Sequence, residues 1–196
     1  MTADDATPRR EPQGLDALRR LGWNDDVARR WSDAVPDELD GLQPGRVTRT
    51  DRGEVDVGTG SGEVRATMTT AASDTVAGDW VALAIDEARV EHVVERHSAF
   101  VRRAARGAKR PQTLAANMDV VAAVASCEPG VNPRRLEREV VLAYQSRARP
   151  LVVVTKSDLV DDPRLAADIA RNSAPGVDVV MVSNRSGEGI DELRSL

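Results

Sequence analysis

The feature that most constrains this chain is a repeated order of apolar strand and amphipathic helix that begins near residue 117. Residues 120–125 are all Val or Ala, a nearly continuous apolar run that is typical of a strand buried on both faces. Similar runs follow at residues 151–155 and 177–182. Strands that alternate with helices form a parallel sheet, because each connection must cross over the sheet. The sequence therefore predicts an α/β unit in residues 117–196.

The segments between these strands carry signals for the start of a helix. Asn132-Pro133 and Asp162-Pro163 each place a capping side chain before a proline that suits the first helical turn. Apolar residues at helical spacing are expected to face the sheet. The residues so predicted are Leu136, Val140, Val141 and Tyr144 in the first helix, Leu165 and Ile169 in the second, and Ile190 and Leu193 in the third.

Upstream of this unit the hydrophobic pattern has the period of β-strands. In residues 63–69, for example, apolar and polar side chains alternate, as in a strand with one buried face. Turns rich in Gly, Asp and Ser separate the predicted strands, which are residues 46–49, 54–57, 63–69, 79–85 and 89–94. Such closely spaced short strands predict a small all-β barrel of the OB-fold type, and a small SH3-like barrel would give the same pattern. Trp80 is predicted to lie in the barrel core.

These patterns divide the chain into segments. The predicted segments are an N-terminal tail with short helices at 1–40, an OB-fold-like barrel at 41–97, a basic linker at 98–116 and an incomplete α/β domain at 117–196. The chain carries a formal net charge of −5, which argues against a uniformly basic coat for nucleic acid. A local patch is still compatible with that net charge.

The linker supplies such a patch. Its basic residues are Arg102, Arg103, Arg106, Lys109 and Arg110. Guanidinium and ammonium groups give sequence-independent affinity for RNA phosphates, so this basic run is a candidate RNA contact. A solvated interdomain linker is the alternative interpretation.

Other residue types exclude several kinds of site. Cys127 is the only cysteine, so no disulfide and no cysteine-based metal cluster is expected. His92 and His97 lack the neighbours that a metal site needs, and no metal site is predicted. No apolar stretch is long enough to span a membrane, and the N-terminus lacks the apolar region of a signal peptide. The sequence therefore predicts a cytoplasmic protein without a membrane partner.

Two short polar motifs lie directly after predicted strands of the α/β unit. They are Thr155, Lys156, Ser157 and Asp158 after the strand at 151–155, and Ser183 and Asn184 after the strand at 177–182. Ligands of open α/β sheets bind at the carboxyl ends of the strands. Each motif alone is an ordinary polar turn, but together they resemble the guanine-recognition motifs of GTPases.

The residue types suit a guanine base. The Asp158 carboxylate can accept two hydrogen bonds, from the guanine N1–H and the N2 amino group, an arrangement that adenine cannot offer. The Lys156 stem can lie along the base while its ammonium stays hydrated. Ser183 and the backbone N–H of Asn184 can order their loop and meet the guanine O6. Thr155 stands where the GTPase motif usually has Asn, so its tie to a phosphate loop is expected to be weaker.

The order of these motifs resembles that of a circularly permuted GTPase, in which base recognition precedes the phosphate loop. The barrel and the segments RVTRTDRGEV, AGDWVAL, RHSAFVRRAA, LAANMDVVAAVAS, NPRRLEREVVLAY and VVVTKSDLVDDP are similar to the RsgA (YjeQ) family of GTPases that depend on the small ribosomal subunit. The resemblance runs from about residue 21 to the end and covers only the N-terminal part of that family. No Gly-x-x-x-x-Gly-Lys-Ser/Thr is present in the sequence.

The resemblance implies a GTPase that binds the small (30S) ribosomal subunit, contacts rRNA through its barrel and hydrolyses GTP during late subunit maturation. It also implies GTP or GDP as the ligand, held in this chain by guanine contacts only, and magnesium and zinc whose ligands lie in other parts of the full-length family. No residue is predicted to be catalytic, and the 196-residue chain alone is expected to be monomeric and inactive. The alternative is a non-enzymatic rRNA-binding or interaction module that has lost GTPase activity.

Overall fold

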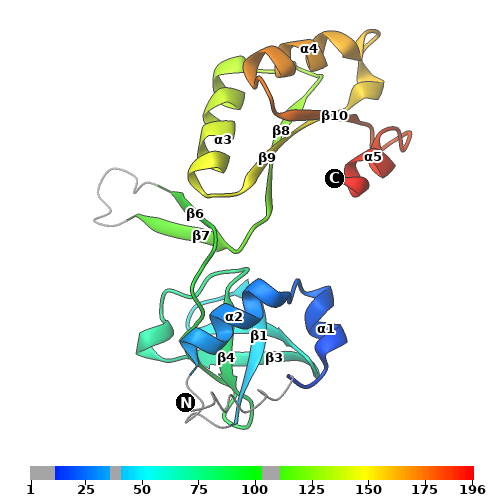
Figure 1. Ribbon diagram of the computed structural model, residues 1–196. Helices are drawn as coiled ribbons and strands as arrows, with labels where there is room; N and C mark the ends of the chain where they lie inside the picture. Colours follow the sequence, from blue (N-terminus) through cyan, green and yellow to red (C-terminus); the bar gives the residue numbers. More distant parts are fainter. Residues whose placement is uncertain (1–11, 36–40, 103–110) are drawn as a thin grey trace, which may run out of the picture. The chain divides into compact units, whose positions relative to one another are not determined.

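The computed structural model describes residues 12–35, 41–102 and 111–196 (Figure 1). The chain divides into two compact units. The first consists of Met1–Arg96 with Gln112–Asn117, and the second of His97–Pro111 with Met118–Leu196. Across the described ranges, no helix has both the length and the apolar character needed to cross a bilayer.

A closed barrel of five strands forms the centre of the first unit. Its strands are β1 (Leu42–Thr50), β2 (Glu54–Thr59), β3 (Gly62–Met68), β4 (Trp80–Ala84) and β5 (Arg89–Val93). Their order is β1-β2-β3-β5-β4, and the barrel closes where β1 pairs with β4. β3 and β5 pair in parallel, whereas the other neighbours are antiparallel. This order is that of the OB fold, which confirms the predicted barrel and excludes the SH3-like alternative.

Two N-terminal helices, α1 (Leu15–Arg20) and α2 (Asp25–Ala34), pack on this barrel around Trp80. Trp80 is 2% exposed, and the ring of Trp23 meets it edge-on at a centroid distance of 5.1 Å. The Arg46 guanidinium lies 5.7 Å from the Trp80 ring centroid. Trp80 is therefore buried, but it packs between the barrel wall and the two helices and not in the barrel interior that was predicted, where Val81 and Leu83 lie instead.

The glycine-rich turn between β2 and β3 allows the N-terminal segment to approach the barrel backbone. A Cβ atom added at Gly60 would lie 1.8 Å from the carbonyl oxygen of Gln13. A Cβ atom added at Gly14 would lie 2.0 Å from the carbonyl oxygen of Gly60. Both neighbours are backbone atoms that cannot turn aside, so glycine is required at these positions by close packing.

We expect Gly60→Ala to lower the free energy of unfolding by about 2 kcal/mol or more, because the methyl group must displace the Gln13 backbone. Urea denaturation followed by the fluorescence of Trp23 and Trp80 measures this loss. Gly62→Ala in the same turn is the control, since its added methyl meets open space and only its positive φ of 130° is strained. That strain is expected to cost about 1 kcal/mol. Equal losses in the two variants would contradict the packing argument.

The second unit is a parallel three-stranded sheet in the order β10-β9-β8, with helices on both faces. Its elements are β8 (Val120–Ser126), α3 (Pro133–Gln145), β9 (Arg149–Thr155), α4 (Pro163–Ser173), β10 (Asp178–Val182) and α5 (Ile190–Ser195). On one face, Val152 and Val154 pack in a cluster with residues of α3 and α4. On the other face, Val153 and Val180 pack with residues of α5. The predicted strand–helix order and parallel sheet are confirmed.

The inward face of α3 differs from the predicted one. Leu136 and Val140 are buried as predicted, but Val141 is 51% exposed and Tyr144 is 57% exposed. The buried residues Leu136, Val140 and Ala143 follow one another at spacings of four and three, which places them on one face. Val141 and Tyr144 each lie one position beyond a buried residue, about 100° further around the helix, and the prediction for them was wrong.

The same kind of error occurs in α4. Leu165 is 65% exposed, whereas Ala166, Ala167 and Ala170 are buried and Ile169 is partly buried. Small alanines let the helix approach the sheet closely, so the large apolar residue at the helix start is not the one that packs inward. The prediction for Leu165 was wrong.

β8 was predicted to be buried on both faces, and that prediction was also wrong. It is an edge strand that pairs only with β9, and Val120 and Val124 are 37% and 52% exposed. Val124 lies opposite Val153 in the β8–β9 register, on the face that α5 covers. The α5 cluster contains Val153 but no described residue of β8, so this face of β8 is left uncovered.

Candidate functional site

The two polar motifs meet at the carboxyl ends of two neighbouring strands of the α/β sheet. β9 and β10 run in parallel, and Thr155 at the end of β9 lies opposite Val182 at the end of β10. Asp158 follows in a short 3-10 helix, η2 (Ser157–Leu159), and Ser183 follows Val182 directly. Residues 25 positions apart in the sequence are thereby brought together at the carboxyl ends of neighbouring strands.

A hydrogen bond joins the two motifs. The Ser183 hydroxyl donates to Oδ1 of Asp158 at 2.6 Å. Ser183 is fully buried, whereas Asp158 is exposed. The same hydroxyl oxygen accepts the backbone N–H groups of Arg185 and Ser186, at 3.2 and 3.1 Å. Asp158 is thus held by a fixed donor through one oxygen, while the carboxylate remains accessible to a ligand.

The loop that carries Ser183 is compact. The N–H of Ser183 donates to the carbonyl of Glu188 at 3.0 Å, and the N–H of Gly187 donates to the carbonyl of Ser183 at 2.9 Å. Gly189 adopts a left-handed φ of 72°, and a Cβ atom there would lie 1.9 Å from the carbonyl oxygen of Met181. Asn184 is exposed at the start of this loop. Within the described residues its backbone N–H forms no hydrogen bond, which leaves a donor beside the carboxylate loop.

The end of β9 is tied to the end of β8. The Thr155 hydroxyl donates to the carbonyl of Ala125 at 3.0 Å, and the N–H of Cys127 donates to the carbonyl of Thr155 at 2.9 Å. Thr155 therefore fixes the strand end rather than facing outward. Lys156 follows in the left-handed region with a φ of 60°, and its side chain is exposed. A left-handed non-glycine residue is uncommon and fixes the direction in which the loop leaves the strand.

Two buried groups lie close to this site. Ser157 is 5% exposed, and its hydroxyl has no hydrogen-bond partner among the described residues. Burial raises the pKa of the Cys127 thiol, and the negative charge of Asp158 raises it further. Cys127 is therefore an uncharged thiol at neutral pH. Its position beside Asp158 was missed by sequence reasoning, because only the parallel register of β8 and β9 brings the two together.

A comparison with known protein families shows to which family the chain belongs. The profile of the RsgA GTPase family matches residues 93–196, which is more than half of the chain. The chain belongs to the RsgA GTPase family. The match includes the whole α/β unit with both polar motifs.

Curated RsgA relatives agree with this assignment. The small ribosomal subunit biogenesis GTPase RsgA of Streptomyces coelicolor is 40% identical over 191 residues, which cover 92% of this chain and 51% of the relative. The protein of the same name from Streptomyces avermitilis is 38% identical over 186 residues, 89% of this chain and 49% of the relative. The chain therefore spans about half the length of the curated relatives that it matches.

A solved structure shares the fold. The crystal structure of YjeQ from Thermotoga maritima aligns with a TM-score of 0.61 at 20% sequence identity, and the alignment covers 79% of this chain and 56% of that one. At this identity the likeness concerns the fold alone. It supports an OB barrel followed by a parallel sheet with helices, as described above.

A cavity of about 390 Å³ reaches Thr155, the first residue of one of the two polar motifs of this RsgA-family chain. It lies between the carboxyl end of β8 and the start of α3, and Thr155, Ser126 and Asn132 are among its lining residues. Arg135 and Glu139 also line it and form an ion pair with each other at 2.7 Å. The cavity was not predicted from the sequence, because it depends on the exposed position of β8 at the sheet edge.

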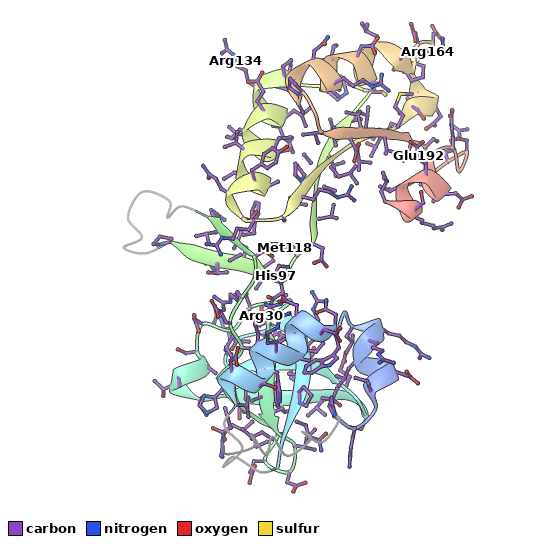
Figure 2. All side chains as sticks on the ribbon, in the orientation of Figure 1. Arg30, His97, Met118, Arg134, Arg164 and Glu192 are labelled. Carbon is purple, nitrogen blue, oxygen red and sulfur yellow. The ribbon has the colours of Figure 1, made fainter. Side chains whose placement is uncertain are left out.

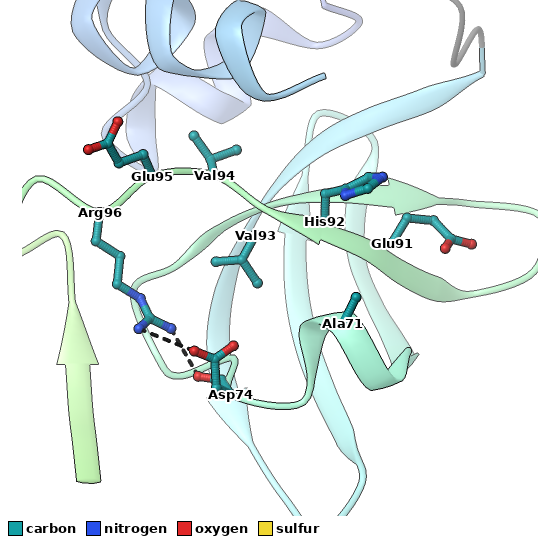
Figure 3. A pocket seen from close by; sticks show the side chains of 8 residues that line it. All are labelled: Ala71, Asp74, Glu91, His92, Val93, Val94, Glu95 and Arg96. Atoms are coloured by element: carbon teal, nitrogen blue, oxygen red, sulfur yellow. Dashed lines mark hydrogen bonds and ion pairs between the residues drawn. The ribbon is translucent and has the colours of Figure 1, made fainter. Parts of the chain in front are cut away.

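A second cavity of similar size lies on the barrel unit, and its lining side chains are drawn in Figure 3. Arg96 is one of its lining residues and binds the fully buried Asp79 through two hydrogen bonds of 2.7 Å. These hydrogen bonds raise the pKa of Arg96, which stays charged. The Arg96 guanidinium also donates a hydrogen bond to the backbone carbonyl of Asp74. The ion pair holds the chain before β4 in place, so we interpret this cavity as a structural feature of the barrel.

The histidines and the basic run complete the predicted set. His92 is exposed, and His97 lies 3.4 Å from Asp119. Among the residues that the structure describes, no group of three His, Cys, Asp or Glu side chains could hold a metal ion. The segment predicted as a linker contains two strands, β6 (Ala99–Arg102) and β7 (Gln112–Ala116). Arg102 is exposed at the end of β6, while the other predicted RNA contacts lie outside the described residues; these are Arg103, Arg106, Lys109 and Arg110.

Proposed function

We propose that this chain recognises the guanine base of GTP or GDP at the carboxyl ends of β9 and β10. The observation that carries the proposal is the 2.6 Å hydrogen bond from Ser183 to Asp158. It orients an exposed carboxylate at the place where open α/β sheets bind ligands. The proposed contact residues are Thr155, Lys156, Ser157, Asp158, Ser183 and Asn184.

The residues have different roles in this proposal. Asp158 accepts the N1–H and N2 amino hydrogens of guanine, and the free backbone N–H of Asn184 donates to O6. The exposed Lys156 side chain lies along the base. Thr155 fixes the strand end through Ala125, and the buried Ser157 contributes through the loop backbone rather than through its hydroxyl. Adenine has no N1–H, so its ring nitrogen would face the carboxylate without a donor between them.

Titration of the chain with GDP and with ADP tests base recognition directly. Charge-assisted hydrogen bonds contribute roughly 1.5–3 kcal/mol each, whereas association costs about 4 kcal/mol or more. Base contacts alone therefore give an affinity in the millimolar range or weaker. NMR is expected to show saturable shifts of the Lys156, Asp158 and Asn184 amides with GDP and none with ADP. Equal shifts with both nucleotides would contradict the proposed site.

The function of the whole protein is proposed from its relatives. Both Streptomyces relatives are named small ribosomal subunit biogenesis GTPases, and we propose that this protein acts in the same process in the cytoplasm. The phosphate loop of a GTPase supplies most of the charge stabilisation for hydrolysis. Because the sequence contains no Gly-x-x-x-x-Gly-Lys-Ser/Thr, we propose that these 196 residues contribute base recognition without GTP hydrolysis.

We further propose that the basic run at residues 102–110 is the part of the chain that contacts rRNA. Many OB folds instead bind nucleic acid on the outer surface of β2 and β3. On that surface Arg65 is within 3.3 Å of three carboxylates, those of Asp51, Glu54 and Asp56. The positive charge of Arg65 is therefore neutralised by carboxylates on the same outer surface of the barrel. Arg102, by contrast, forms no ion pair with any described residue and is exposed.

We expect the triple variant Arg102→Ala, Arg103→Ala, Arg106→Ala to bind all RNA sequences more weakly. If all three side chains contact duplex phosphates, the slope of log affinity against log salt should fall by about 2.7. Fluorescence anisotropy with a labelled rRNA hairpin, measured over a salt series, gives that slope. The control is Arg19→Ala, Arg164→Ala, Arg171→Ala, which removes equal charge from α1 and α4. An unchanged slope in the first variant would show that the basic run is only a linker.

A further inference from the structure

The loop that follows β9 begins with a residue in an unfavourable backbone conformation. Lys156 is in the left-handed region with a φ of 60°. Residues other than glycine keep such a conformation only where the surrounding structure holds it. We call residues 156–162 the β9 loop; it leads into α4, whose second residue, Arg164, is labelled in Figure 2. Contacts on both sides of Lys156 are therefore needed to fix the β9 loop.

On the C-terminal side of Lys156, the β9 loop is held by the residue that follows β10. The Ser183 hydroxyl donates to Asp158 at 2.6 Å. Within the loop, the N–H of Leu159 donates to the carbonyl of Lys156 at 3.2 Å. These bonds fix the carboxylate of Asp158, but they act after the left-handed residue and do not fix the point at which the chain leaves β9.

On the N-terminal side of Lys156, Thr155 ties the chain to β8. Its hydroxyl donates to the carbonyl of Ala125 at 3.0 Å, and its carbonyl accepts the N–H of Cys127 at 2.9 Å. Ser126 lies opposite Thr155 in the β8–β9 register. Thr155 is thus bonded to the residues on both sides of its register partner, directly before the β9 loop begins.

The hydroxyl of Thr155 serves this internal contact. A threonine hydroxyl has one hydrogen to donate, and that of Thr155 is directed to Ala125. Ser126 lines the same cavity as Thr155, and its hydroxyl likewise donates to a main-chain carbonyl, that of Glu128, at 2.6 Å. Both hydroxyls at this end of the cavity therefore organise the chain itself, and neither directs its hydrogen toward a ligand.

We propose that Thr155 is a positioning residue for guanine recognition. Its hydroxyl, bonded to Ala125, holds the chain at the left-handed turn of Lys156 and so keeps Asp158 in place for the base. This inference rests on the proposed guanine site. It makes guanine affinity depend on a bond to β8, although no residue of β8 is among the proposed contacts. Loss of the bond lowers the fraction of molecules whose loop can bind, and the apparent affinity falls by the same factor.

Two substitutions separate the hydroxyl of Thr155 from its shape. Thr155→Val removes the hydroxyl and keeps the branched side chain, whereas Thr155→Ser keeps the hydroxyl. NMR titration of the full chain with GDP measures affinity from the initial slope of the amide shifts against nucleotide concentration. Thr155→Val should weaken GDP binding about fivefold, and Thr155→Ser should bind within about twofold of the unmodified chain. Thr155→Ala removes the same hydroxyl with less bulk and should behave like Thr155→Val.

Ser146→Ala is the matched control. It also removes a buried hydroxyl that donates to a main-chain carbonyl, that of Leu142, at 2.8 Å. Ser146 precedes β9, so it lies at the end of the strand opposite to Thr155. A general loss of stability in the α/β unit would affect both variants, whereas loss of positioning should affect Thr155→Val alone. GDP binding by Ser146→Ala should therefore equal that of the unmodified chain.

The single cysteine gives a second measurement that needs no nucleotide. Cys127 is 7% exposed, so its thiol reacts with a chromogenic disulfide reagent only when this segment opens. Thr155→Val should react about fivefold faster than the unmodified chain, because one of the bonds that hold the ends of β8 and β9 together is lost. Thr155→Ser and Ser146→Ala should react at the unmodified rate.

Equal GDP affinity of Thr155→Val and the unmodified chain would overturn the proposal. So would weak binding by Thr155→Ser, since the hydroxyl would then not be the group responsible. If the unmodified chain showed no preference for GDP over ADP, the proposed guanine site would fail. The thiol rates would then decide separately whether Thr155 holds the loop to β8: a faster rate in Thr155→Val alone supports this role, and equal rates reject it. Dispersed amide spectra establish that each variant is folded.

Discussion

Asp158→Asn is expected to abolish measurable binding of GDP and to permit binding of a xanthine nucleotide. In the proposed complex the Asp158 carboxylate accepts two hydrogen bonds from guanine, whereas the amide of Asn presents one acceptor and one donor. The donor would face the N2 amino group of guanine without an acceptor between them. Xanthine carries a carbonyl oxygen at that position, which accepts from the amide. The substitution removes charge-assisted hydrogen bonds to guanine and places an amide donor against the N2 amino group. Together these changes are expected to weaken GDP binding by about 100-fold or more.

The local structure should survive this substitution. Oδ1 of the introduced Asn can still accept the Ser183 hydroxyl that now donates to Asp158. NMR titration with GDP and with xanthosine diphosphate measures both effects, and unchanged amide shifts in the free protein establish that the loop is intact. Asp161→Asn, three residues further on and also exposed, is the matched control. Normal GDP binding by Asp158→Asn would place the nucleotide elsewhere on the molecule.

The second large effect is expected at the exposed edge of the α/β sheet. β8 pairs only with β9, so the backbone groups on its other edge have no strand partner among the described residues. Val120 and Val124 are exposed along it. Apolar edges of this kind recruit further strands from other chains. We expect the chain to be monomeric at low micromolar concentration and to associate as the concentration rises, with faster amide exchange in residues 117–196 than in the closed barrel.

A single lysine on this edge should suppress association. Val124→Lys places a charge on the exposed face of β8, and sedimentation velocity over a concentration series should show a monomer where the unmodified chain associates. Leu165→Lys is the control, because Leu165 is 65% exposed on α4, away from the edge, and its replacement should leave association unchanged. Equal and strong hydrogen-exchange protection of both units in a monomeric sample would contradict this account of β8.

The features that depend on local sequence were predictable. Strand periodicity predicted the barrel, because alternation of apolar and polar residues requires one buried face. The helix starts were predicted correctly from Asn132 and Asp162, whose side chains accept the backbone N–H groups of Arg135 and Arg164. The two polar motifs were located directly after predicted strands, and the structure places them at the ends of β9 and β10. Each of these inferences needs only a few consecutive residues and the hydrogen-bonding groups that they carry.

Other features depend on which elements become neighbours, and only the tertiary structure decided them. Val141 and Tyr144 are apolar residues at helical spacing, yet they are exposed because the sheet contacts the face of Leu136 and Val140. Thr155 binds Ala125 because β8 and β9 are in parallel register. The orientation of Asp158 likewise comes from a hydroxyl 25 residues away. The sequence determined which groups were available, whereas the packing of strands and helices decided which of them face solvent, the core or one another.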